Sequence, residues 1–271
     1  MPARHGWRNA VNPSPTQMKS LLGIAGMLLA AHQCLALTVS LSASKDNTLY
    51  EEPAGADSNG TGDSIYAGRT GAFEGPNNRR ALIAFDTSAL PPDATITAVT
   101  LTLFVVKAGF AAPAKNVSLF ALTSTWGEGA SLNNSGNPAP AEPGDATWLH
   151  RFYSTSLWSK PGGDFDPQPS AVTLIKNTGS GFYSWSGAGL VEDVQSWTTT
   201  STLNFGWLIG GNEALSNTAV RFSSREAATV ANRPQLTVTY TVVPEPTCAT
   251  MLLLGTSLLG LSARRNHFKR G

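Results

Sequence analysis

Short stretches in which apolar and polar residues alternate constrain the fold of this chain most strongly. Residues 236–242 read LTVTYTV, which places Leu236 and Val238 on one side of an extended backbone and threonines on the other. Residues 97–106 repeat the pattern, with Val99 and Leu101 in phase. A period of two is that of a β-strand with one buried and one solvated face. The pattern therefore predicts antiparallel sheets.

Further strand candidates are separated by Gly, Pro, Asn and Asp, as expected for an all-β sandwich or barrel. They cover residues 37–43, 64–68, 80–86, 117–123, 171–176, 181–185, 204–210 and 219–224. One segment differs, because Leu190, Val194 and Trp197 have helical spacing and predict a short helix over 189–198. Two stretches rich in Gly, Pro, Asn and Ser, residues 127–146 and 154–170, predict long loops.

The N-terminal segment has the pattern of a secretory signal peptide. An apolar run over residues 20–31 follows Lys19, and Cys34, Leu35 and Ala36 give a small-x-small cleavage site. We therefore predict a signal peptide over residues 1–36. Met18 stands directly before this pattern and is an alternative translation start.

The C-terminal segment, residues 244–271, combines three features. Pro244, Glu245 and Pro246 precede an apolar run over 247–263, and Arg264 and Arg265 follow it. As a helix the run would measure about 26 Å, slightly short of a membrane core, with the basic cluster on the cytoplasmic side. This order resembles a PEP-CTERM sorting signal. The alternative is an ordinary single-pass tail anchor.

The PEP-CTERM resemblance implies a transient anchor in the inner membrane of a Gram-negative bacterium. It also implies the export machinery and an exosortase as partners, removal of the tail, and release to the cell surface or extracellular matrix.

Cysteine content and charge fit an exported domain over residues 37–243. Cys34 and Cys248 are the only cysteines, and both lie in the end segments, so the domain has no disulfide framework. The domain holds 12 Lys and Arg against 17 Asp and Glu, whereas the whole chain has a net charge of +1. This mildly acidic balance gives no indication of nucleic-acid binding.

The domain resembles a DNRLRE domain over nearly its whole length. The resemblance implies an antiparallel jelly-roll-like β-sandwich of the carbohydrate-binding-module type, some relatives of which bind acidic polysaccharides. The motif that gives the family its name begins here with Asp46 and Asn47, as in DNRLRE. It then continues as TLYE instead of RLRE. The matching segments are 46–49 (DNTL), 67–68 (AG), 80–86 (RALIAFD), 90–91 (LP), 94–96 (ATI), 100–104 (TLTLF), 126–129 (WGEG), 146–148 (ATW), Trp158, 162–163 (GG), Val194 with Trp197, 222–226 (FSSRE) and 234–236 (PQL).

Six tryptophans fall in the domain, and each could stack on a sugar ring or pack in a core. Trp197 and Trp207 lie in strongly patterned segments and are assigned to the core. The others flank the predicted loops. The candidate carbohydrate-binding residues are Trp126, Trp148, Arg151, Tyr153, Trp158, Tyr183 and Trp185.

Residues 57–63 (DSNGTGD) form an oxygen-rich loop that resembles the start of a calcium-binding loop. Asp57, Asn59, Thr61 and Asp63 would supply hard oxygen ligands, and Gly62 stands at the sixth position. The twelfth position, where a glutamate ligand is expected, is Gly68. The favoured alternative is therefore a solvated hairpin turn. Residues 164–166 (DFD) are a second calcium candidate, and structural calcium is the one cofactor considered.

Five arginines could line a groove for acidic sugars, because guanidinium forks match carboxylates. The alternative is structural ion pairing, of Arg80 with Asp86 and of Arg225 with Glu226 or Asp193. The five are Arg79, Arg80, Arg151, Arg221 and Arg225.

The sequence offers little material for catalysis. His150 is the only histidine of the domain, and the Gly-x-Ser-x-Gly nucleophile motif is absent. A lyase built from His150, Arg151 and Tyr153 is an alternative, although adjacent strand residues point to opposite faces. Paired carboxylates for glycoside hydrolysis are another. The sequence thus predicts an exported non-catalytic surface or matrix protein associated with extracellular polysaccharide. The alternatives are a secreted polysaccharide hydrolase or lyase, and a structural module that binds proteins through a sheet edge.

Overall fold

The computed structural model describes residues 35–71, 77–111, 114–133, 137–177 and 179–242. Residues Leu35–Val242 form one compact unit. The predicted signal-peptide core and the predicted sorting segment lie outside the described residues. Among the helices that the structure describes, none has the length and apolar character needed to span a membrane.

Strands account for 45% of the structure and helices for 9%, so the prediction of a mostly β protein is confirmed. In chain order, the elements are β1 (Ala36–Tyr50), β2 (Asp57–Ser58), β3 (Ser64–Arg69), β4 (Asn78–Phe85), β5 (Thr95–Ala108), β6 (Ala114–Ala121), β7 (Ala139–Pro140), β8 (His150–Phe152), β9 (Ser156–Leu157), β10 (Ala171–Lys176), β11 (Gly181–Ser186), α2 (Ala188–Thr199), the 3₁₀ turn η1 (Ser201–Leu203), β12 (Trp207–Gly210), β13 (Val220–Ser223), the 3₁₀ turn η2 (Val230–Asn232) and β14 (Gln235–Thr241).

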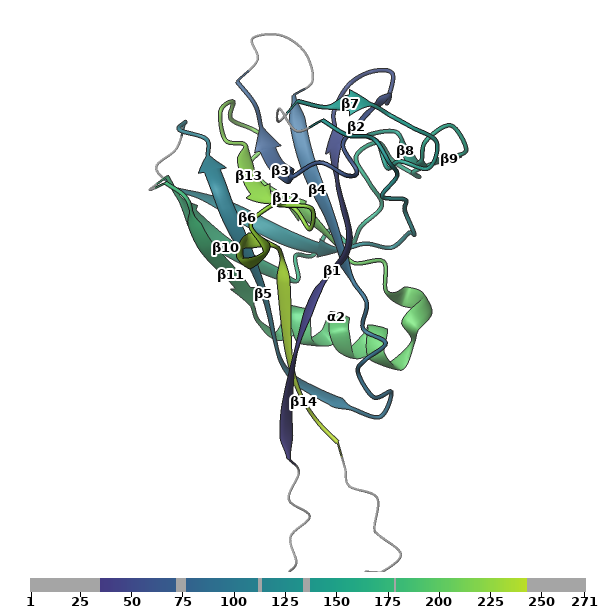
Figure 1. The fold of residues 1–271 in the computed structure, drawn as a ribbon, viewed down its shortest axis with the longest axis vertical. Helices are drawn as coiled ribbons and strands as arrows, with labels where there is room; N and C mark the ends of the chain where they lie inside the picture. Colours follow the sequence, from purple (N-terminus) through teal and green to yellow (C-terminus); the bar gives the residue numbers. More distant parts are fainter. Residues whose placement is uncertain (1–34, 72–76, 112–113, 134–136, 178, 243–271) are drawn as a thin grey trace, which may run out of the picture. The chain divides into compact units, whose positions relative to one another are not determined.

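Six strands close into a barrel, in the order β1, β14, β5, β13, β3, β4 and back to β1. Strand β1 closes the ring because its two halves have different partners. Residues 36–42 pair with β14, and residues 43–50 pair with β4 after an irregularity near Lys45. In Figure 1 the purple β1 and the yellow-green β14 run side by side. Strands β12, β6 and β10 continue the sheet from β4, and β11 pairs with β5.

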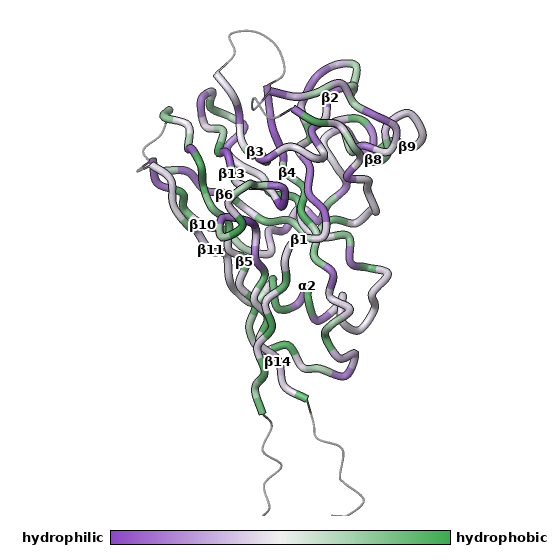
Figure 2. Tube along the Cα trace, viewed as in Figure 1, coloured by the Kyte–Doolittle hydropathy of each residue, from purple (hydrophilic) through white to green (hydrophobic). Residues whose placement is uncertain are grey.

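The alternation predicted from the sequence produces the main core. Along β5, Val99, Leu101, Leu103 and Val105 are buried, and the residues between them are more exposed. Strand β14 adds Leu236 and Val238 to the same cluster. Figure 2 shows this alternation as green residues between pale and purple ones along the strands.

The predicted short helix is confirmed as α2, which packs against β5 and β10. Leu190, Val194 and Trp197 are its buried residues and join the main core. Gly189 belongs at the first turn because a Cβ there would lie 2.5 Å from the carbonyl oxygen of Ser170. The helix ends at Thr199, where threonine hydroxyls bond back to helical carbonyls and weaken further propagation.

A second core lies on the other side of the sheet formed by β1, β4 and β12. Its members are Leu49, Leu82, Ala84, Leu122, Trp126, Ala146, Trp148, Trp158 and Leu208. The segments predicted as long loops contribute Ala146 and Trp158 to it and contain the short strands β7 and β9, and residues that flank these segments add Trp126 and Trp148. The second half of β1 is therefore covered on both faces, and its last five residues are all buried.

Candidate functional site

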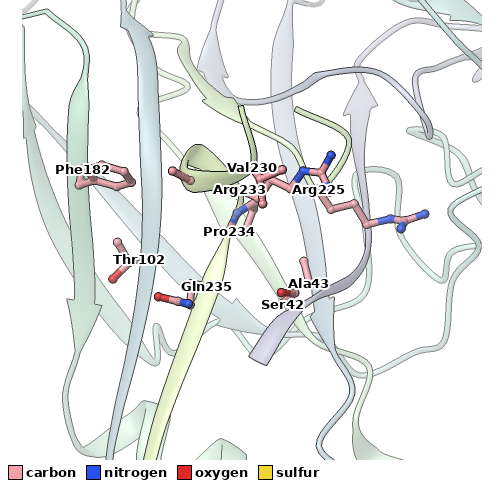
Figure 3. Close-up of a pocket in the computed structure, with 10 residues that line it drawn as sticks. Ser42, Ala43, Thr102, Phe182, Arg225, Val230, Arg233, Pro234 and Gln235 are labelled. Atoms are coloured by element: carbon pink, nitrogen blue, oxygen red, sulfur yellow. The ribbon is translucent and has the colours of Figure 1, made fainter. Parts of the chain in front are cut away.

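An open pocket of about 410 Å³ lies where β1, β5, β11 and β14 meet the segment 225–235. Phe182 on β11 lines it and is 56% exposed, with its ring edge-on to Phe104 at 5.0 Å between centroids. Figure 3 shows Phe182 and Thr102 on one side and Arg225 and Arg233 toward the other. The pocket thus combines an accessible aromatic ring with the side chains of two arginines.

Arg225 connects this pocket to a cluster of acidic residues behind it. Its Nε and Nη2 atoms donate to the two carboxylate oxygens of Glu128 at 2.6 and 2.8 Å. Its Nε atom also lies 2.8 Å from Oε1 of Glu226. Its backbone N–H donates to Oδ2 of Asp46 at 2.7 Å. A single residue therefore contacts three carboxylates.

The three carboxylates of Asp46, Glu128 and Glu226 come from distant parts of the chain. One oxygen from each lies within 4.8 Å of the others. Asp46 is 1% exposed at the centre of β1, and its backbone N–H donates to Oε1 of Glu128 at 2.8 Å. These residues lie in the segments DNTL, WGEG and FSSRE, three of the segments that carry the DNRLRE resemblance. The fold brings these segments together.

Burial leaves this acidic cluster incompletely compensated. Burial, reinforced by the charge of Glu226, raises the pKa of Asp46 well above its usual value. Burial also raises the pKa of Glu226. Within the described part of the chain, Oδ1 of Asp46 and Oε2 of Glu226 are buried and have no hydrogen-bond partner. Asp46 and Glu226 therefore each have one buried oxygen that no described group contacts by a hydrogen bond.

Two glycines allow Glu128 to reach the cluster. A Cβ at Gly127 would lie 1.8 Å from the carbonyl oxygen of Gly144. Gly129 has a φ of +75°, and a Cβ there would collide with the Asp145 carboxylate. The backbone on either side of Glu128 is thus pressed against residues 144–145, which only glycine permits.

Asn47 fixes the same region from the opposite face of β1. Its Nδ2 donates to Oγ of Ser58 at 2.9 Å and to the carbonyl of Glu128 at 2.8 Å. Its Oδ1 accepts from the N–H of Asn59 at 3.3 Å. The fully buried amide therefore holds two loops against the strand.

The four tryptophans predicted as sugar platforms lie inside the protein, between 0% and 8% exposed. The indole N–H groups of three of them bond to backbone carbonyls, with Trp126 donating to Phe205, Trp158 to Thr147 and Trp185 to Val117. Trp148 packs under the Arg80 guanidinium at 4.8 Å. The ring faces of these tryptophans are therefore not accessible to a sugar, and they stabilise the two cores.

The other predicted carbohydrate-binding residues are half-buried and do not converge on one surface. Tyr183 lies on β11, where its hydroxyl contacts the backbone of Lys176 at 3.3 Å. Tyr153 follows β8 and meets the ring of His150 edge-on at 5.3 Å. Arg151, also on β8, donates to the carbonyl of Thr125 at 3.5 Å.

The predicted calcium loop uses its oxygens within the protein. Oδ1 of Asn59 accepts from the N–H of Asn133, and Thr61 donates to the carbonyl of Ser131. Asp63 pairs with Arg221 at 3.1 Å. Asp57 belongs to β2, which pairs with β7. These contacts fit a turn, but it is packed against residues 131–133 and is not the solvated hairpin turn of the alternative, since Ser58 is 0% and Asn59 2% exposed.

The second calcium candidate is also tied into its own loop. Although partial burial alone would raise its pKa, hydrogen bonds from Ser159, Ser124 and Lys160 hold the pKa of Asp164 below the usual value. Its carboxylate closes the turn over residues 159–164.

The predicted pairing of Arg80 with Asp86 is wrong. Arg80 instead forms a two-point pair with Glu213, at 2.6 and 2.9 Å, and Asp86 accepts the N–H of Ser88. The sequence could not show this, because Glu213 is 133 positions away. The predicted pair of Arg225 with Glu226 is present.

Sequence reasoning missed the acidic cluster and the exposed Phe182. The cluster joins positions 82 to 180 residues apart, so local spacing carries no signal for it. Phe182 and Trp185 lie three positions apart on β11, so their side chains face opposite sides of the sheet. The sequence alternation along β11 could therefore have identified Phe182 as exposed.

Comparisons with known proteins do not assign the chain. No family model matches it, and no curated protein matches it. A crystal structure of a protein of unknown function from Shewanella oneidensis MR-1 is 14% identical, with a TM-score of 0.22, over 87% of this chain and 98% of that one. A likeness at this level supports no inference about function. Fold and site together define a β-rich protein with a surface pocket that adjoins a cluster of one buried and two partly buried carboxylates.

Proposed function

We propose that this chain is an exported, non-catalytic surface or matrix protein that associates with extracellular polysaccharide. The pocket beside Phe182 carries the proposal. An accessible aromatic ring can stack on the apolar face of a sugar, and Thr102 and Gln235 add hydrogen-bonding groups. Arg233 adds a positive charge that favours a polysaccharide with carboxylate groups, whereas the guanidinium fork of Arg225 is already bound to Glu128.

The sequence resemblances support the same assignment. The DNRLRE resemblance favours a jelly-roll-like sandwich of the carbohydrate-binding type as the finer description of the β-rich body. The PEP-CTERM resemblance favours export, an exosortase as partner, and release from a transient membrane anchor. Mass spectrometry of the protein secreted by its host tests this second part. We expect a mature chain that begins near Leu37 and ends near Pro244, and an intact mass would contradict processing.

Affinity electrophoresis of the full chain tests the binding proposal. Gels contain alginate as the acidic polysaccharide, dextran as the neutral one, or the exopolysaccharide of the host. We expect retardation in alginate or in the host polysaccharide that weakens as salt increases. Unchanged mobility in all three gels would refute the proposal.

Matched variants locate the binding surface. Phe182→Ala removes the aromatic ring and Arg233→Gln removes one positive charge, so each should weaken retardation severalfold. Phe110→Ala is the control, because Phe110 is 74% exposed and does not line the pocket. Equal binding by Phe182→Ala and wild type would place the sugar elsewhere.

The same polysaccharides test the catalytic alternative. The contact between His150 and Tyr153 is the observation that favours a lyase, because both side chains can transfer protons. We expect no unsaturated products and no new reducing ends after long incubation. Product formation that disappears in His150→Ala would establish the lyase instead.

A further inference from the structure

We propose that Asp46, Glu128 and Glu226 bind one divalent cation, calcium, at the point where β1 meets the loop 126–129 and the turn after β13. These residues differ from the 57–63 loop in which the sequence suggested calcium. The proposal concerns the interior of the domain and does not rest on polysaccharide binding.

The unpartnered oxygens are the first reason. Oδ1 of Asp46 and Oε2 of Glu226 are buried, and no described group donates to either. Asp46 as a whole is 1% exposed, so solvent does not replace the missing partner. Buried polar atoms in folded proteins nearly always have a partner, and an unpaired buried carboxylate oxygen is costly. Both atoms belong to carboxylates of one group whose oxygens lie within 4.8 Å of one another.

The charge balance is the second reason. Three carboxylates meet one guanidinium, that of Arg225, and the ammonium group of Lys45, whose closest contact is the carbonyl of Trp126 at 2.6 Å. Arg225 occupies both oxygens of Glu128 and one oxygen of Glu226. Its backbone N–H occupies one oxygen of Asp46. Asp46 and Glu226 thus each retain one oxygen, which suits a shared ligand carrying positive charge.

The donor set points to calcium among the common cations. The ligands are hard carboxylate oxygens, which suit calcium and magnesium, whereas zinc prefers nitrogen and sulfur. Calcium accepts irregular coordination and completes its shell with water, and magnesium requires near-octahedral geometry. The carboxylates here come from a strand, a loop and a turn. Ligands from such different elements fit calcium, which tolerates irregular coordination, better than magnesium.

A cation at this position would link segments that are far apart in the chain. It would tie the centre of β1 to the loop that covers the second core and to the turn that leads into the pocket through Arg225. Binding to the folded state alone raises its stability. At a hundredfold excess over the dissociation constant, the melting temperature should rise by about 5–10 °C for a domain of this size.

Titration of the full chain with calcium chloride after EDTA treatment and dialysis tests the proposal. We expect isothermal titration calorimetry to give one calcium ion per chain, with a dissociation constant below about 1 mM, the weak end of protein calcium sites. Glu226→Gln keeps the size of the side chain and should weaken binding at least tenfold. Asp57→Asn is the matched control in the 57–63 loop and should bind as wild type does.

Thermal melting provides a second, independent readout. In EDTA, Glu226→Gln should melt at or above the wild-type temperature, because its amide can donate to Asp46. With calcium the order should reverse, because only the wild type gains a cation. Asp46→Asn should lose the calcium-dependent shift, and Glu226→Gln carries the test where Asp46→Asn does not fold.

Three results would overturn the proposal. The first is a wild-type protein with no binding heat and no melting shift at millimolar calcium, which would indicate that the carboxyl groups share a proton instead. The second is unchanged affinity in Glu226→Gln. The third is loss of binding in Asp57→Asn, which would move the site to the 57–63 loop.

Discussion

Trp185 and Phe182 lie on opposite faces of β11, and their replacement by alanine separates a structural role from a binding role. Trp185 is fully buried, packs edge-on against Phe222 at 6.1 Å, and donates to the carbonyl of Val117 at 2.8 Å. Phe182 is 56% exposed and lines the pocket. If buried tryptophans stabilise the cores, the two variants should differ strongly in stability.

The expected magnitudes follow from burial. Truncation of a buried tryptophan to alanine costs about 3–5 kcal/mol, and loss of the hydrogen bond to Val117 adds about 1 kcal/mol. Trp185→Ala should therefore lower the free energy of unfolding by about 4–6 kcal/mol, a large part of the stability of a typical domain. The melting temperature should fall by about 10–20 °C. Phe182→Ala should cost about 1 kcal/mol, because more than half of the ring is already exposed.

Urea unfolding followed by tryptophan fluorescence and far-UV circular dichroism measures both variants. Affinity electrophoresis at a temperature where each variant is folded completes the comparison. Trp185→Ala should keep its retardation in polysaccharide, and Phe182→Ala should show retardation weakened severalfold. A stability loss below about 2 kcal/mol for Trp185→Ala, or equal losses for both variants, would refute the reasoning from burial.

Three further predictions concern other buried polar groups. Burial raises the pKa of Asp193, whose Oδ2 accepts from Nε1 of Trp207 at 2.6 Å, so the folded state binds its proton up to a higher pH than the unfolded chain does. This contribution to stability is lost as pH rises from the ordinary value of 3.8 through the raised pKa. The melting temperature of Asp193→Asn relative to that of the wild type should therefore increase as pH rises over that window. A difference in melting temperature that does not depend on pH would contradict the assignment. Asn47→Ala should lower the free energy of unfolding by about 2–4 kcal/mol in urea, because it leaves buried loop groups without their partner, and a loss below 1 kcal/mol would show that the loops are held by packing alone. Arg80→Lys should cost about 1–2 kcal/mol in the same assay, since lysine does not reproduce the fork that holds Glu213, and a neutral result would show that this half-buried pair contributes nothing.

The main sheet could be predicted from the sequence because its signal is local. Strand β14 alternates strictly, and the helical spacing of Leu190, Val194 and Trp197 identifies α2 in a chain otherwise rich in strands. Each pattern reports which face of its own element is buried. Closure of the barrel through β1 could not be predicted from the sequence, because the change of partner near Lys45 depends on where β4 and β14 lie in space.

The second core explains why the tryptophans were misinterpreted. Trp126 and Trp148 flank the segments whose many small and polar residues indicated loops, and Trp158 lies within one of them. Loops are normally at the surface, so their aromatic residues looked accessible. Here the loops form a layer over the outer face of β1, β4 and β12, and the indoles fill the space beneath that layer. The local sequence pattern does not distinguish a solvent-exposed loop from a loop that packs against a sheet.

The positions of the resembling segments bear on what a family resemblance can transfer. Asp46, Asn47, Glu128 and Arg225 all lie in those segments, and all serve a buried polar network that fastens loops to β1. Of the residues that line the pocket, Phe182 and Arg233 lie outside these segments, whereas Thr102, Arg225 and Gln235 lie inside them. A chain could therefore keep the network and change Phe182 and Arg233, although Arg225 belongs to both the network and the pocket. The resemblance is thus an argument about architecture, and the proposed binding of polysaccharide rests on the pocket.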